Sequence, residues 1–303
     1  MLLPILSILI VLVFFPAYLI YTLLTGRRRD RLSWLLEVLM GAAFVLLVTL
    51  IGRWDWLSIY LRFVPLVLYA GAVVLSYRRV RELPFRAESG ARAEWVSGAL
   101  GTLLAAGMLG VSVSGWFVAR EPVQLAFPFR GGAYYVAQGG SSFIVNYHRS
   151  HPEQAFAADI TKLNAAGARA AGFRPAALER YAIFGEPVYS PCEGEVVSAE
   201  GSLPDLTPPE RDPENPPGNH VAIACQGVTV VLAHLQQGSV TVEPGDTVTN
   251  GQMLGRIGNS GNTDEPHLHI HAFEGGVMGE ELGAGVPVSF EGRMPVRNMV
   301  YRR

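Results

Sequence analysis

The chain divides into a first part with long apolar runs and a second part with short alternating ones. Four runs in the first part have about the length of ~20 residues that a helix needs to cross a bilayer, and they cover residues 2–24, 33–52, 58–77 and 95–118. From about residue 133 onward, short β-rich stretches are cut by Gly, Pro and Asn, which is typical of strands joined by turns. The pattern predicts an N-terminal all-α transmembrane region of about four helices, residues 1–120. A C-terminal, mainly antiparallel β domain, residues 121–303, follows it.

Arginines in the connecting segments predict the orientation of the helices. Residues 26–31 (GRRRDR) and 78–86 (RRVRELPFR) are rich in Arg, whereas residues 52–56 (GRWDW) are short and aromatic. Because Lys and Arg concentrate in cytoplasmic loops, both Arg-rich segments are predicted to be cytoplasmic, and the β domain lies outside. A cleavable signal peptide is the alternative for the first run, but that run is too long and its charges follow it.

Within the β domain, three stretches carry the clearest strand pattern. Residues 193–200 predict one strand, 219–235 predict two strands joined by a hairpin, and 239–258 predict short strands between turns. Residues 201–218 are too polar and proline-rich to be core. Two interpretations of this excursion stay open: a semi-rigid wall beside a groove, or a surface segment with no role.

Composition and charge remove several classes of function. The formal net charge of −2 excludes the basic patch that a nucleic-acid-binding protein needs. Lys162 is the only lysine, which removes lysine-based covalent chemistry from most of the chain. Cys192 and Cys225 are the only cysteines, each in a predicted strand, and no CxxC pair supports a zinc–thiolate site. Outside the cytoplasm the two cysteines are expected to form a disulfide.

Three histidines stand on alternate positions of one predicted strand, after a loop rich in Gly and Asn. His267, His269 and His271 alternate with Leu268 and Ile270, so the three imidazoles share one face and the aliphatic side chains enter the core. One histidine on a strand is usually a polar residue that meets water. Several in register indicate metal or acid–base chemistry.

Other candidate residues are spread along the β domain: His148, His151, His220, His234 and Asp159. Asp159 has apolar neighbours on both sides, and a carboxylate in such surroundings is costly unless it is paired or ligated. Two histidines and one aspartate with an open coordination position describe a catalytic zinc site. No HExxH sequence occurs, so proton transfer would fall to further histidines.

The stretches VNYH, QAFAADI, VLAHL and GNSGNT…PHLHIH resemble the lysostaphin/LytM-type zinc metallopeptidases, the peptidoglycan endopeptidases, over roughly residues 130–300. The resemblance implies a zinc cofactor, a peptidoglycan peptide as substrate and a place in the bacterial cytoplasmic membrane. It also implies the zinc ligands His148, Asp159 and His269 and the catalytic pair His234 and His267.

The resemblance further implies a mechanism. Zinc polarises the scissile carbonyl and lowers the pKa of its bound water. His267 accepts the proton of that water and passes it to the leaving amine, while His234 stabilises the oxyanion.

One departure from the family pattern concerns the first ligand. Many members hold this ligand and the aspartate four residues apart, whereas His148 is eleven residues from Asp159 and His151 is eight. His148 is favoured because its Asn-x-His context resembles membrane-anchored relatives, and His151 stays the alternative. His220 and His271 are expected either to have no role in zinc binding or to hold the zinc ligands in place through hydrogen bonds.

Three other functions are alternatives to a zinc peptidase. Residues 242–257 also resemble the hairpin of biotinyl and lipoyl carrier domains, but they lack the lysine that a carrier needs. The spans carry no paired charges or repeat that would indicate a transport or sensing device with an accessory peptidase. A non-catalytic module that binds peptidoglycan or regulates another cell-wall hydrolase is the more serious alternative. All five site positions are filled, which favours an active enzyme, and no regulatory partner can be named.

The Arg-rich segments give a prediction about topology. An alkaline phosphatase fused after Arg303 should be active, because this enzyme folds only outside the cytoplasm and the β domain is expected there. Activity of a reporter that works only in the cytoplasm, fused at the same residue, would overturn the predicted orientation.

Overall fold

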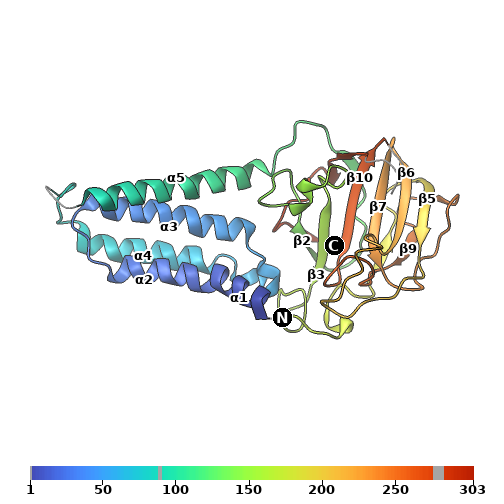
Figure 1. Ribbon diagram of the computed structural model, residues 1–303, viewed down its shortest axis with the longest axis horizontal. Helices are drawn as coiled ribbons and strands as arrows, with labels where there is room; N and C mark the ends of the chain where they lie inside the picture. The colour runs from blue at the N-terminus through green and yellow to red at the C-terminus, as the bar shows by residue number, and fades with distance from the viewer. Residues whose placement is uncertain (1, 88–90, 276–282) are drawn as a thin grey trace. The chain divides into compact units, whose positions relative to one another are not determined.

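The computed structural model describes residues 2–87, 91–275 and 283–303. These residues form two compact units, labelled by element in Figure 1. Unit 1 comprises Met1–Trp54 and Ser58–Val113, and unit 2 comprises Asp55–Leu57 and Ser114–Arg303. The first is helical and the second is mainly an antiparallel β-sheet, so the expected fold class is confirmed.

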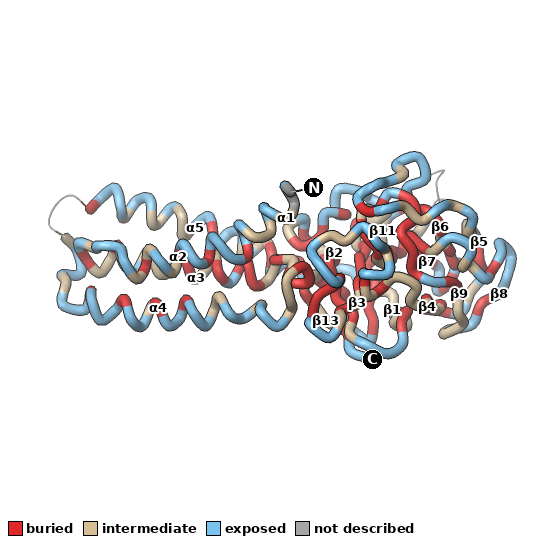
Figure 2. Tube along the Cα trace, turned by 90° about the horizontal axis from the view of Figure 1, so that it is seen from below, coloured by how far each residue is buried: buried red, intermediate tan, exposed pale blue. Residues whose placement is uncertain are grey.

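The described part of unit 1 and the start of unit 2 contain four helical stretches long and apolar enough to cross a membrane. They run over Ile5–Thr25, Arg31–Ile51, Ile59–Val80 and Arg92–Ser114. The first combines α1 (Leu2–Leu9), a π-helical stretch (Ile10–Phe14) and α2 (Phe15–Thr25); α3 (Arg31–Ile51), α4 (Val64–Val80) and α5 (Arg92–Ser114) supply the others. Much of their surface is exposed and apolar, as a lipid-facing helix requires (Figure 2).

The last span ends earlier than the apolar run predicts. The run extends to residue 118, but α5 stops at Ser114. The carbonyl of Gly115 accepts a hydrogen bond from the backbone N–H of Ser141 at 2.9 Å, so this residue is already part of unit 2.

Unit 2 is built on one nine-stranded sheet whose neighbouring strands are all antiparallel. The strand order is β13–β2–β3–β10–β7–β6–β5–β8, and β11 also pairs with β10. The bounds are β2 (Ala133–Gln138), β3 (Ala158–Leu163), β5 (Gly194–Glu200), β6 (Asn219–Cys225), β7 (Val228–Leu235), β8 (Thr247–Val248), β10 (Leu268–Glu274), β11 (Ala284–Val286) and β13 (Val300–Arg302). Two small sheets accompany it, β1 (Val123–Leu125) with β12 (Val288–Phe290) and β4 (Pro187–Tyr189) with β9 (Met253–Arg256).

The predicted strands and hairpin are present. β5 lies in 193–200, β6 and β7 form the hairpin in 219–235, and the short β8 and β9 lie in 239–258. Figure 1 shows β3, β10, β7 and β6 side by side.

Alternate side chains of strand β10 point to opposite faces of the sheet, one facing the hydrophobic core and the other polar. Leu268 and Ile270 are fully buried in the main hydrophobic core. His269 points to the opposite face and is paired in register with Asp159 on β3 and with Ala233 on β7. Because directly opposite residues project from the same face of a sheet, Asp159 and His269 meet there.

The expected disulfide between Cys192 and Cys225 is confirmed. Cys225 ends β6 as predicted, but Cys192 lies in the turn between β4 and β5 rather than in a strand. The carbonyl of Cys192 accepts a hydrogen bond from the Ser190 hydroxyl at 2.6 Å, which holds this turn.

Removing the disulfide should destabilise unit 2. The bridge closes a loop with a sequence separation of 33 residues, for which the chain-entropy argument gives about 3–4 kcal/mol of stabilisation. The pair Cys192→Ala with Cys225→Ala should therefore melt at a lower temperature than the unchanged protein. Alkylation of protein isolated from its own compartment should add no mass to either cysteine. Two alkylated thiols, or an unchanged melting temperature, would contradict the prediction.

Candidate metal centre

Three buried side chains converge on the polar face of the sheet. The Nε2 atom of His148 and the Nδ1 atom of His269 each lie 3.0 Å from Oδ1 of Asp159. One ligand atom from each residue lies within 4.8 Å of the other two, and all three residues are buried. The structure thus brings together the three residues expected to bind zinc, from a 3-10 turn, from β3 and from β10.

This group of donors suits a zinc ion. Imidazole nitrogen and carboxylate oxygen are common zinc ligands, with bonds of ~2.0–2.2 Å that place tetrahedral ligand atoms roughly 3.3 Å apart. Burial alone would raise the pKa of Asp159, but His148 and His267 lower it well below its usual value, so the carboxylate is ionised. Burial holds the pKa of His269 at about 3, so this ring is neutral and can bind a metal. The arrangement is a His, Asp, His group that can hold a metal ion.

Asn146 fixes the turn that presents His148. Its side chain accepts a hydrogen bond from the backbone N–H of His148 at 3.2 Å and donates to the carbonyls of Gly140 and Ala157, each at 3.0 Å. Asn146 is fully buried, so the turn Tyr147–Ser150 is anchored to the residue before β3. The Asn-x-His context in the sequence does not by itself reveal this role of the Asn146 amide.

His151 differs from His148 in its surroundings. It lies just after the turn, is exposed to solvent and lines the pocket, but is not one of the three converging residues. His220 lies on β6, where it interacts with Ser198 and with the carbonyl of Gly218, and it does not line the pocket.

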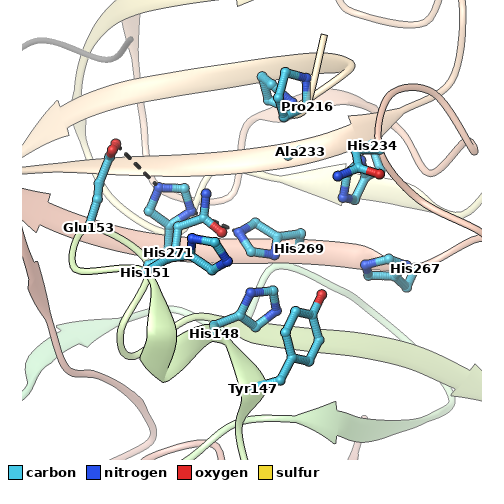
Figure 3. A pocket seen from close by; sticks show the side chains of 13 residues that line it. Tyr147, His148, His151, Glu153, Pro216, Ala233, His234, His267, His269 and His271 are labelled. Atoms are coloured by element: carbon cyan, nitrogen blue, oxygen red, sulfur yellow. Dashed lines mark hydrogen bonds and ion pairs between the residues drawn. The ribbon is translucent and has the colours of Figure 1, made fainter. Parts of the chain in front are cut away.

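The two remaining site histidines, His234 and His267, are held in the same way. The Nδ1–H of His234 donates to the carbonyl of Ser260 at 2.9 Å, and that of His267 donates to the carbonyl of Glu265 at 2.9 Å. A hydrogen bond at Nδ1 fixes the tautomer and leaves Nε2 for chemistry. Their ring centroids are 4.9 Å apart, and Nε2 of His267 lies 3.5 Å from Oδ1 of Asp159 (Figure 3).

The pKa values of the His234 and His267 rings shift in opposite directions. Burial and the neighbouring His267 and His269 keep the pKa of His234 well below its usual value. Burial also acts to lower the pKa of His267, but the charge of Asp159 outweighs it and raises that pKa. His234 also adopts a left-handed backbone, with φ of 64°, which is uncommon for a non-glycine residue and frequent at functional sites.

His271 supports His269 from the side away from Asp159. Nε2 of His269 lies 3.0 Å from Nδ1 of His271, whose Nε2 lies 3.8 Å from the carboxylate of Glu153 (dashed in Figure 3). A hydrogen-bond partner behind a ligating imidazole commonly fixes which nitrogen binds the metal, and here that partner is the His271 ring. In His269 this arrangement leaves Nδ1 for the metal.

A pocket of about 480 Å³ opens above these histidines. Pro216 and Pro217, from the proline-rich excursion, line one side of it. The carbonyl of Pro217 accepts from the backbone N–H of His234, and that of Pro216 from Asn262, each at 3.0 Å. These contacts favour the wall interpretation of residues 201–218.

Comparison with known families identifies the domain. Residues 179–279 match the family model described as Peptidase family M23. The chain carries an M23 peptidase domain. The matched range includes His234, His267 and His269, whereas His148 and Asp159 lie before it. The roles expected of individual residues in this M23 domain remain predictions.

Solved structures with a similar arrangement are distant from this chain. The lysostaphin catalytic domain from Staphylococcus simulans is 20% identical, with 38% of this chain and 68% of that chain covered and a TM-score of 0.24. A zinc-containing peptidase from Vibrio cholerae is 21% identical, with 37% and 26% covered and a TM-score of 0.24. The SpoIIQ–SpoIIIAH pore-forming complex is 18% identical, with 43% and 59% covered and a TM-score of 0.27. In the last two, less than two thirds of the other chain is covered. No curated protein matches the sequence.

The choice between His148 and His151 as first ligand can be tested directly. His148→Ala should remove zinc and activity, because it takes away one of three converging donors. His151→Ala should leave zinc content unchanged and activity within about threefold, a barrier change below about 1 kcal/mol. Metal content by mass spectrometry of the full chain checks both, with His220→Ala as a control outside the pocket. Zinc lost from the His151 variant and kept in the His148 variant would reverse the assignment.

Proposed function

We propose that this protein is a membrane-anchored zinc metalloendopeptidase that cleaves peptide bonds in peptidoglycan, in its cross-links or stem peptides. The observation that carries the proposal is the buried group of His148, Asp159 and His269 in an M23 domain, beside two histidines whose Nδ1 atoms are bound to backbone carbonyls. The four membrane-spanning candidates support an anchor in the bacterial cytoplasmic membrane. With the Arg-rich segments in the cytoplasm, the M23 domain would meet the cell wall outside.

The residues of the chain divide the chemistry between them. His148, Asp159 and His269 would hold zinc, which lowers the pKa of water and polarises a carbonyl. His267 would accept a proton from the attacking water and pass it to the leaving amine. His234 would be the second member of the pair, with the oxyanion-stabilising role that the resemblance implies.

The pocket fits an extended peptide better than a compact molecule. Its wall of Pro216 and Pro217 is held by backbone hydrogen bonds, so the shape of this side is set before substrate binds. Tyr147 is exposed at the rim, next to His148, with ring centroids 4.0 Å apart. An exposed aromatic ring beside a rigid proline wall offers apolar contacts to both sides of a peptide chain.

Digestion of purified peptidoglycan by the full chain tests the proposal. Mass analysis should reveal fragments released by cleavage of a peptide bond. His267→Ala should keep near-stoichiometric zinc and lose activity by a factor on the order of 100 or more, whereas His269→Ala should lose the zinc itself. Zinc-loaded protein that releases no fragments would favour the non-catalytic, regulatory alternative, and a swap of the two phenotypes would reverse the assignment along His267 and His269.

A further inference from the structure

Arg169 is a buried charge to which the proposed reaction gives no role. It follows β3 and is 1% exposed. Its Nε and Nη2 atoms lie 2.9 and 2.7 Å from one oxygen of Glu265, Oε2. Hydrogen bonds between two charged groups are shorter and stronger than those between neutral groups, so this contact fixes the Glu265 side chain in one place.

Glu265 connects Arg169 to the site through its own backbone. Its carbonyl oxygen accepts the Nδ1–H of His267 at 2.9 Å. The same oxygen accepts the Thr263 hydroxyl at 2.8 Å, and that hydroxyl lies 3.2 Å from Nδ1 of His267. A displacement of Glu265 would therefore move the acceptor that sets both the tautomer and the direction of the His267 ring.

The surroundings of Arg169 prevent it from turning away. Its Nη2 also donates to the carbonyl of Phe173 at 2.8 Å. The guanidinium carbon lies 3.7 Å from the ring centre of Trp56, and Asp55 has a carboxylate oxygen 4.0 Å from Nε. Asp55 and Trp56 belong to the short segment that packs within unit 2. Arg169 is thus held by a carboxylate, a carbonyl and an aromatic face.

The loop between β9 and β10 has a second, weaker attachment. Asp264 pairs with Arg174 and lies 3.0 Å from Arg211. The Asp264 side chain is 36% exposed, against 11% for Glu265, so solvent screens its ion pairs more strongly. Among the described residues, the carbonyl of Asp264 accepts no hydrogen bond from His267. The buried pair of Arg169 and Glu265 is therefore the attachment of this loop that is connected to the His267 ring.

We propose that Arg169 and Glu265 are positioning residues for the peptidase reaction. They hold the carbonyl that orients His267, so that Nε2 of this ring faces the attacking water. This inference rests on the proposed function, in which His267 carries the proton. It assigns no contact with substrate or metal to either residue.

Glu265→Gln in the full chain is the direct test. The amide keeps the size of the side chain and one acceptor oxygen but removes the charge, and Asp55 remains near Arg169, so folding should be retained. We expect kcat on soluble peptidoglycan fragments to fall between about tenfold and a hundredfold, the scale for a misplaced catalytic group or a lost support of one. KM and zinc content should stay within about twofold of the unchanged protein.

Hydrogen exchange measured by mass spectrometry gives a second readout that needs no substrate. Exchange should rise in peptides covering residues 259–268 of the Glu265→Gln protein and stay unchanged elsewhere in unit 2. This measurement separates the two proposals, because it tests the positioning even if the unchanged protein cleaves no peptidoglycan. Glu274→Gln is the matched control: it makes the same chemical change in an exposed pair with Arg120, 2.6 Å away, and should alter neither rate nor exchange around His267.

Arg169→Lys provides a second variant, because it keeps the positive charge but cannot place two nitrogens on one oxygen. It should show the same local rise in exchange and a loss of kcat without loss of zinc. Two outcomes would overturn the proposal. One is unchanged rate and exchange in both variants; the other is a loss of rate that comes only with lost zinc or with raised exchange across the whole of unit 2.

Discussion

The register between β3 and β10 is the constraint on which the metal-binding group depends. Asp159 stands directly opposite His269, so two ligands separated by 110 residues in the chain meet on one face. A slip of one residue in the pairing of β10 with β3 would turn each side chain of β10 to the opposite face and bring His269 into the core. Leu268 and Ile270 resist that slip because both are fully buried in the main core. The same hydrophobic packing that stabilises the sheet therefore decides which atoms can hold a metal.

Loops supply what the sheet does not, namely the directions of the rings. The carbonyl of Ser260 orients His234, the carbonyl of Glu265 orients His267, and the amide of Asn146 holds the turn of His148. In the first two cases a loop carbonyl accepts from a histidine ring, and in the third a side chain accepts from the backbone N–H of His148. A site of this kind combines a rigid support with acceptors that fix proton positions, which is what proton transfer at a set distance requires.

Hydrophobic length and alternation predicted the four apolar helices and the β domain, because both report directly on local structure. The disulfide was expected from two cysteines in a domain placed outside the cytoplasm, and the grouping of His148, Asp159 and His269 was implied by the resemblance to the lysostaphin/LytM-type peptidases. None of these signals predicted that Arg169 lies beside Glu265. A buried ion pair between residues 96 positions apart leaves no periodic signal, and each residue alone resembles an ordinary surface charge. The apolar run also extends four residues past the end of α5, because hydropathy does not distinguish the helix from the apolar residues that follow it.

The proline-rich excursion, residues 201–218, connects two neighbouring strands, β5 and β6, and supplies one side of the pocket. Antiparallel neighbours accept connections of many lengths, and the entropic cost of a longer loop grows slowly. Insertions or deletions here would reshape the groove without disturbing any strand register or any donor atom of the metal-binding group. In proteins built on this sheet, the wall of the pocket can therefore diverge during evolution while the metal-binding group stays the same.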